Sequence, residues 1–244
     1  MQKFEPDYSF FEKEIQSELW NLNEFPLVCR NSTAKSKIPL KNPTQSILRT
    51  PIKLLPLYGL RAVDVFSFNH NPNWEILTGF NFQKGLANRL SILGANGEIN
   101  LTIPVKKHPS ETPIFEIQID HMQKWQNQHW RSLLSSYGKS PFFQFYKEEL
   151  EQIFFQTPSL LIDFTIPIMK WIHQQLYKRG EFSVNMSFGS NENGGIYLVS
   201  PAGILYNEQL DSEPIYSQVF GDKFVKGLSI LDALFCEGPG YIKS

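Results

Sequence analysis

The sequence predicts a mixed α/β protein, in which one core with a mixed sheet is flanked by helices and preceded by an N-terminal extension. Alternating apolar residues on both sides of an Asn-Gly pair indicate a β-hairpin within this sheet. Further along the chain, apolar residues recur at helical spacing in three successive segments. The composition changes near residue 52. We therefore expect an extension over residues 1–52 and an α/β domain over residues 53–244.

Composition narrows the class of protein. Hydrophobic residues make up 41% of the chain, enough for a sizeable core. The net charge of −1 gives no general attraction to nucleic acid or to anionic lipid, so neither partner is expected. The two cysteines, Cys29 and Cys236, form neither a disulfide framework nor a metal-binding pair. Because no signal peptide and no apolar run of about 20 residues is present, we predict a cytoplasmic protein without a membrane span.

The extension combines an acidic beginning with a basic continuation. Phe11, Ile15 and Leu19 are spaced as on one face of a helix, which predicts an amphipathic helix over residues 8–20. No acid occurs between Glu24 and Asp64, while lysines and arginines accumulate among Ser, Thr, Asn and Pro. This basic arm is interpreted either as a phosphate-contacting segment or, more ordinarily, as a solvated linker.

Several strands are predicted in the α/β domain. Residues 53–58 and 74–77 are short apolar candidates, and residues 115–119 alternate between apolar and polar. The hairpin joins residues 89–93 to residues 99–105 through Gly94-Ala95-Asn96-Gly97, where Asn and Gly tolerate positive φ. Two later strands are expected over residues 181–186 and 195–199.

The helices carry start signals. Asp120, followed by Gln123, resembles a capping box and predicts a helix that continues to about residue 137. Ser140-Pro141 and Thr157-Pro158 each place a hydroxyl before a proline, a pattern typical of a helix start. Pro167 falls inside the last of these helices and should kink it. A short apolar helix is expected over residues 228–235.

No strong catalytic signature is present in the sequence. The chain lacks a Walker loop, a GxGxxG turn, HExxH and GxSxG, so the cofactor, if any, is left unknown. His121 and His129 lie eight residues apart on one predicted helix, too far to share a metal directly. We therefore expect no metal site.

Two local groups of polar residues are candidates for a site. Lys84, Asn88 and Arg89 supply a point charge, a carboxamide and a guanidinium fork, which suit a phosphate or carboxylate. Their ordinary interpretation is a solvent-facing strand entry. Trp125 and His129, at i and i+4, would place an imidazole beside an indole, as a general base with a stacking wall. The alternative is a helix face that packs on the sheet.

These segments resemble the WbqC-like protein family. The resemblance rests on Phe82-Gln83-Lys84, Asn88-Arg89, the turn at residues 92–97 and Leu101-Thr102-Ile103-Pro104-Val105. It continues through Trp125, His129-Trp130, Tyr137 and residues 140–143, and residues 216–239 are similar to one bacterial branch of the family. Together these segments cover residues 53 to 239 in the family's order.

The resemblance implies a role in building O-antigen or other bacterial surface polysaccharides, or in modifying amino sugars. The implied reaction is the transfer of an acyl or aminoacyl group to a sugar or nucleotide-sugar, so the expected partner is a small anionic or sugar substrate. The implied catalytic residues are His129 and Lys84. The implied substrate-binding residues are Asn88, Arg89, Trp125 and Tyr137.

The chain also departs from the family pattern. Leu57-Tyr58-Gly59 replaces a Tyr/Phe-Pro loop, and Ile76-Leu77-Thr78-Gly79 stands where the family has an acid before the lysine. Gly85-Leu86-Ala87 is one residue shorter than its counterpart. These departures support an alternative function, a catalytically silent binding or scaffolding protein. The oligomeric state is left open.

Overall fold

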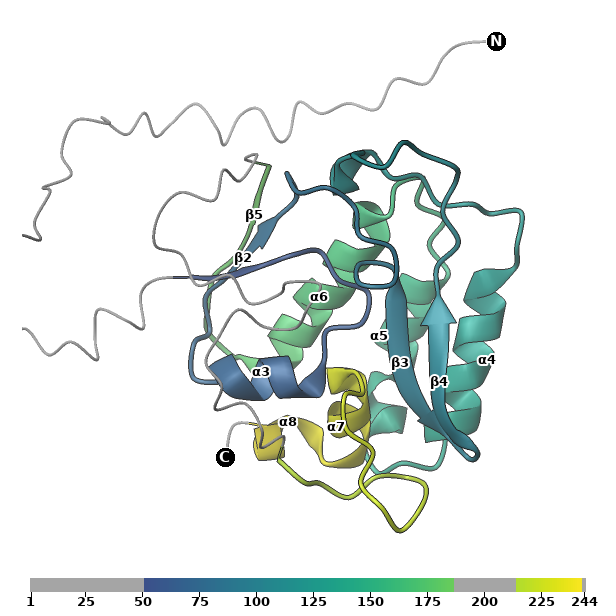
Figure 1. Ribbon diagram of the computed structural model, residues 1–244. Coiled ribbons are helices and arrows are strands. Elements are labelled where there is room, and N and C mark those ends of the chain that lie inside the picture. The colour runs from purple at the N-terminus through teal and green to yellow at the C-terminus, as the bar shows by residue number, and fades with distance from the viewer. Residues whose placement is uncertain (1–50, 187–213, 243–244) are drawn as a thin grey trace, which may run out of the picture. The chain divides into compact units, whose positions relative to one another are not determined.

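The computed structural model describes residues 51–186 and 214–242 (Figure 1). All of them belong to one compact unit, residues 41–244. They confirm the mixed α/β fold class, with parallel and antiparallel strands beside helices. The predicted helix at residues 8–20, the basic arm before residue 51 and the predicted strand at residues 195–199 lie outside the described residues.

A parallel sheet of three short strands is buried at its middle strand and largely exposed at one edge. Its strands are β1 (Ile52–Leu54), β2 (Trp74–Leu77) and β5 (Phe182–Asn185), in the order β1-β2-β5. Trp74 in the central strand pairs with Ile52 on one side and with Phe182 on the other. Trp74 and Ile76 are fully buried, as expected for a central strand of a parallel sheet. The helix α3 (Ala62–Phe68), which the sequence did not predict, connects β1 to β2.

The predicted hairpin is confirmed and forms a sheet of its own. Its strands are β3 (Arg89–Gly94) and β4 (Gly97–Thr102), paired from Arg89↔Thr102 to Gly94↔Gly97. Gly97 adopts a φ of +111°, the left-handed region that glycine enters without steric cost. Leu90, Ile92 and Leu101 are buried, so one face of the hairpin packs into the core.

Two strand predictions need correction. The segment predicted as a strand at residues 115–119 contains the 3₁₀ helix η1 (Ile114–Glu116), followed by single bridges from Gln118 and Ile119. These bridges lead to two different loops, so no continuous ladder forms although Ile117 and Ile119 are buried. The strand predicted at residues 53–58 ends at Leu54, because Pro56 cannot donate to a ladder.

The predicted helices exist, but the three starts predicted from capping signals are wrong. The helices are α4 (Trp125–Tyr137), α5 (Phe143–Phe154), α6 (Ile162–Leu176), α7 (Ile230–Cys236) and α8 (Gly238–Ile242), the last of which was not predicted. Asp120 accepts a hydrogen bond from the Met122 amide in a turn before α4. The Ser140 hydroxyl donates to the Tyr137 carbonyl instead of capping α5. The helix α6 begins four residues after Pro158 and contains Pro167, as predicted.

Helix α7 packs against both the hairpin and α3, the helix that connects β1 to β2. It also packs against α5 and α8 (Figure 1). All of its residues are buried. Ser229 caps it, since the Ser229 hydroxyl accepts a hydrogen bond from the Leu231 amide. Helix α4 also contacts the hairpin, through β3. These contacts bring residues 57–64, 85–91 and 227–229 together.

Candidate functional site

A small cavity lies where these three segments meet. Backbone hydrogen bonds join them: the Tyr58 amide donates to the Ala87 carbonyl, and the Ser229 amide donates to the Ser91 carbonyl. The cavity has a volume of about 90 Å³. We call it the arginine cavity, and its lining residues are Leu57, Gly59, Arg61, Asp64, Gly85, Leu86, Arg89, Ser91, Gly227 and Ser229.

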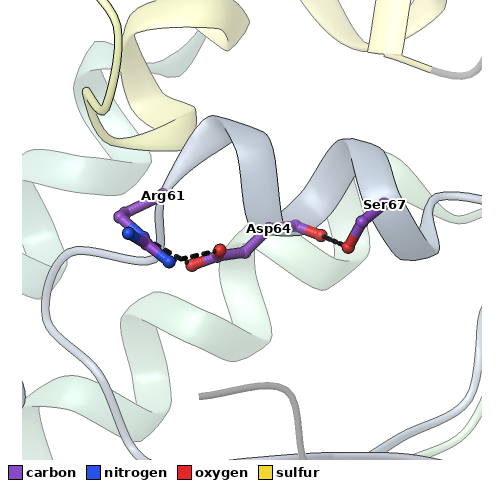
Figure 2. A network of polar contacts seen from close by, with 3 residues as sticks. All are labelled: Arg61, Asp64 and Ser67. Atoms are coloured by element: carbon purple, nitrogen blue, oxygen red, sulfur yellow. Dashed lines mark hydrogen bonds and ion pairs between the residues drawn. The ribbon is translucent and has the colours of Figure 1, made fainter. Parts of the chain in front are cut away.

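Arg61 and Asp64 form an ion pair on one wall of the arginine cavity (Figure 2). Asp64 lies in the first turn of α3, and Arg61 directly precedes that helix. The Arg61 Nε donates to Asp64 Oδ2 at 2.9 Å, and Nη2 donates to Oδ1 at 2.8 Å. The Ser67 hydroxyl donates to the Asp64 backbone carbonyl at 2.6 Å. Burial raises the pKa of Asp64, and the hydrogen bonds and charge of Arg61 act to lower it.

Arg89 lines the same cavity from the first residue of β3. Its side chain is exposed, and it has no hydrogen-bond or ion-pair partner among the residues that the structure describes. The guanidinium lies close to Gly85, because a Cβ placed on Gly85 would be 3.7 Å from Arg89 Cζ. The Arg89 fork is therefore free to take an acceptor from a ligand.

Glycine is required where the segments approach each other most closely. A Cβ on Gly59 would meet the Arg89 carbonyl oxygen and would lie 2.7 Å from Leu90 Cα. Both atoms belong to the backbone of β3 and cannot swing aside. Gly59 thus allows residues 57–64 to lie directly against the strand that carries Arg89.

The other two residues of the predicted strand-entry group differ from Arg89. Asn88 is buried, and its side chain accepts from the Gly85 amide and donates to the Ile103 carbonyl, both at 2.8 Å. These two bonds hold the turn that carries Gly85, one of the lining residues of the cavity. Lys84 is exposed and directly precedes Gly85, but it is not one of the lining residues.

The predicted indole–imidazole pair on α4 is present, and it lies in the core. His129 and Trp125 are 3% and 2% exposed, and their ring centroids lie 5.1 Å apart. The His129 Nδ1 lies 2.9 Å from the Tyr58 hydroxyl, and the two rings stack. Burial lowers the pKa of His129 to about 4, although a hydrogen bond to the backbone of Thr102 acts to raise it. We call Tyr58, Trp125 and His129 the histidine cluster.

Tyr137, at the other end of α4, is also fully buried. Its hydroxyl donates to Asp232 Oδ1 at 2.7 Å and accepts from the Leu93 amide at 3.0 Å. The Tyr216 hydroxyl donates to the second carboxylate oxygen of Asp232 at 2.8 Å. Burial, followed by the charge of Asp232, raises the pKa of Tyr137 well above its usual value. This hydroxyl therefore joins α4, β3 and α7.

The structure thus places the six predicted site residues in different surroundings. Arg89 lines the arginine cavity, whereas His129, Trp125 and Tyr137 do not. Arg61 and Asp64 were missed as site residues by the sequence interpretation. Their i, i+3 spacing directly after Gly59 could have indicated a pair at a helix start, had α3 been predicted. The catalytic and substrate-binding roles stay predictions.

In residues 51–186 and 214–242, no group of three or more His, Cys, Asp or Glu side chains is placed to hold a metal ion. No helix in the same ranges has the length and apolar character needed to cross a membrane.

Fold and cavity define an α/β protein with two arginines in the lining of a small cavity. The profile of the WbqC-like protein family matches residues 59–195, more than half of the chain. The chain belongs to this family, which confirms the resemblance seen in the sequence. The matched range starts at Gly59 and contains Arg61, Asp64 and Arg89. No curated protein and no solved structure matches the chain.

Proposed function

We propose that this protein binds the anionic group of a sugar or nucleotide-sugar in the arginine cavity. We further propose that it acts as a transferase-type enzyme in the modification of bacterial surface polysaccharides or amino sugars. The observation that supports binding is the guanidinium of Arg89, which faces the cavity without a partner among the described residues. Membership in the WbqC-like family supports the substrate class.

The physical basis is the chemistry of guanidinium groups. A planar fork donates two parallel hydrogen bonds to a carboxylate or phosphate, and such charged hydrogen bonds are about twice as strong as neutral ones. Arg61 is already oriented by Asp64, so less conformational freedom is lost when a ligand binds beside it. The small volume suits one anionic group, with the remainder of the substrate outside the cavity.

Within this proposal, Lys84 is the group that moves a proton during transfer. It is exposed and neighbours Gly85, a lining residue. A lysine side chain carries N–H donors, so in this position it would donate a proton to the leaving group of the acyl donor as the sugar attacks. His129 has less freedom for this task, because its imidazole already bonds to Tyr58 and to the backbone of Thr102.

The binding proposal is tested by isothermal titration of the full chain with UDP-N-acetylglucosamine. Replacing Arg89→Ala should weaken binding about 10- to 100-fold, the effect of losing one charge-assisted contact. Arg131→Ala, at an exposed arginine on α4, is the matched control and should bind like the wild type. Equal affinity of the Arg89→Ala variant and the wild type would remove the proposal.

A non-catalytic binding protein is the second candidate function. One observation favours it: the described residues that line the arginine cavity include no histidine, cysteine or lysine, and Asp64 is engaged by Arg61. Steady-state assays with acyl and aminoacyl donors separate the two functions. In an enzyme, Lys84→Met should lower kcat with little change in ligand affinity. A wild type that binds the nucleotide-sugar but transfers nothing would favour the second function.

A further inference from the structure

We infer that the arginine cavity selects a singly charged anion, such as a carboxylate or a phosphodiester, over the dianion of a phosphate monoester. This inference rests on the proposed function, because it concerns the same site. It names the charge of the group that the cavity recognises. The ionisable lining residues that carry it are Arg61, Asp64 and Arg89.

The charge of the lining follows from these three residues. Asp64 is fully buried and accepts from both Nε and Nη2 of Arg61. Each carboxylate oxygen therefore has an N–H donor, an arrangement that fits the ionised form; a protonated acid would direct an O–H against one of those N–H groups. The pair is neutral as a unit. Arg89 adds one positive charge, so the lining residues that the structure describes carry a net charge of +1.

A second negative charge on the ligand would have no counterion among the described lining residues, since Lys84 lies outside the lining. One guanidinium fork, that of Arg89, is open to an acceptor, whereas the Nε and Nη2 of Arg61 are directed at Asp64. The extra charge of a dianion would also lie near the Asp64 carboxylate. Removing an uncompensated charge from water is costly, and like charges in a partly buried site repel. Both effects favour a single negative charge.

Two phosphate esters of similar size provide the test. Methyl phosphate is a dianion at pH 8, since the second pKa of a phosphate ester is near 6, and dimethyl phosphate is a monoanion. Both are titrated into the full chain and followed by ³¹P NMR, with Arg89→Ala as the control for binding at this site. We expect dimethyl phosphate to bind at least about fivefold more tightly than methyl phosphate, with both affinities reduced in the control.

The outcomes separate this inference from the proposed function. If methyl phosphate binds more tightly and still depends on Arg89, the charge selectivity is wrong while the anion site stands. If neither ester depends on Arg89, the proposed anion site itself falls.

Two variants change the charge of the cavity directly. Asp64→Asn keeps the shape of the side chain and raises the net charge by one, which should reverse the preference in favour of methyl phosphate. Ser91→Lys adds the same charge while it keeps the Arg61–Asp64 pair, and it decides the question if Asp64→Asn does not fold. An unchanged preference in a folded variant would overturn the inference.

Discussion

The arginine cavity and the buried core beside it, which contains the histidine cluster, use adjacent residues of the same segments. Gly59 lines the cavity, whereas Tyr58 stacks on His129 in the core. Arg89 lines the cavity, whereas Asn88 is buried and bonds to two backbone groups. Successive side chains of an extended segment point to opposite sides, so one residue step separates a core position from a cavity position.

The comparison shows that a polar residue that suggests a site in the sequence can have either a structural role or a binding role. His129 and Asn88 have their hydrogen-bonding groups engaged inside the protein, as buried polar groups normally do. Arg89 lacks such a partner among the described residues and is exposed. The degree to which the protein itself satisfies a polar side chain therefore distinguishes a structural role from a binding role.

The largest expected effect is on the pH dependence of stability, and it concerns His129. Its pKa is about 4 in the folded protein and about 6.5 in the unfolded chain. As the pH falls from 6.5 to 4, the unfolded chain binds a proton that the folded protein does not. The His129 contribution to the free energy of unfolding should therefore be roughly 3 kcal/mol smaller below pH 4 than above pH 6.5. Urea unfolding at a series of pH values measures this difference.

Carboxylates titrate in the same range, so the His129 effect is taken as a difference between variants. His129→Gln keeps a polar group near Tyr58 and should lose that part of the pH dependence. His121→Gln, at an exposed histidine, should behave like the wild type. Parallel pH curves for His129→Gln and the wild type would show that His129 titrates normally, as a solvent-accessible catalytic base would.

The next largest expected effect is the loss of stability when the Tyr137 hydroxyl is removed. Tyr137→Phe keeps the ring but leaves the buried Leu93 amide and one Asp232 oxygen without the hydroxyl. The free energy of unfolding should fall by about 2 kcal/mol, because unsatisfied buried groups lose their solvation. Anion affinity should not change. The control is Tyr241→Phe, which removes an exposed hydroxyl bond to Ile215 and should cost less than about 0.5 kcal/mol.

A stable Tyr137→Phe variant with weakened UDP-N-acetylglucosamine binding would contradict this assignment. In that case the Tyr137 hydroxyl would contact the ligand, as the sequence interpretation expected.

Local patterns made most of the fold predictable. The hairpin follows from alternation and an Asn-Gly pair, features that act over a few residues. Helical periodicity located α4, α5 and α6, because a buried apolar face fixes a helix over many residues. The helix starts were wrong because the polar side chains of Asp120 and Ser140 bond within the preceding turns instead.

The site was less predictable, because it depends on contacts between distant segments. The Trp125–His129 contact follows from i, i+4 spacing, and the structure shows it. The spacing cannot say whether this face meets solvent or Tyr58, which lies 71 residues away in the chain. Likewise, Ser229 joins the cavity through a backbone bond to Ser91 that no local pattern indicates.

A smaller effect concerns Gly59, at the boundary between the two regions. Gly59→Ala would place a methyl group against the backbone of Arg89 and Leu90, which must then move. We expect a loss of about 1–2 kcal/mol in stability, as for overpacked sites, together with weaker anion binding through the displaced Arg89. Thermal unfolding and titration with UDP-N-acetylglucosamine measure the two effects.

Gly240→Ala, where nothing lies within 4 Å of the added Cβ, is the control. Unchanged stability and affinity in Gly59→Ala would show that the close approach is not needed.

The smallest effect comes from Gly85, and it separates backbone strain from cavity chemistry. Gly85 and Gly97 both have left-handed backbones, with φ of +86° and +111°. An alanine at either position should cost about 1 kcal/mol, since a Cβ is strained there. The surroundings differ: a Cβ on Gly85 would lie 3.7 Å from Arg89 Cζ, while nothing lies within 4 Å of one on Gly97.

We therefore expect the Gly85→Ala and Gly97→Ala variants to unfold at similar urea concentrations but to bind anions differently. The methyl group at residue 85 occupies space beside the Arg89 guanidinium and should weaken binding severalfold, whereas Gly97→Ala should bind like the wild type. Equal affinities at equal stability would mean that the ligand does not approach Arg89 from the side of Gly85. The anion would then lie on the opposite side of that guanidinium, toward Ser91, and only the Arg89 contact itself would remain of the proposed geometry.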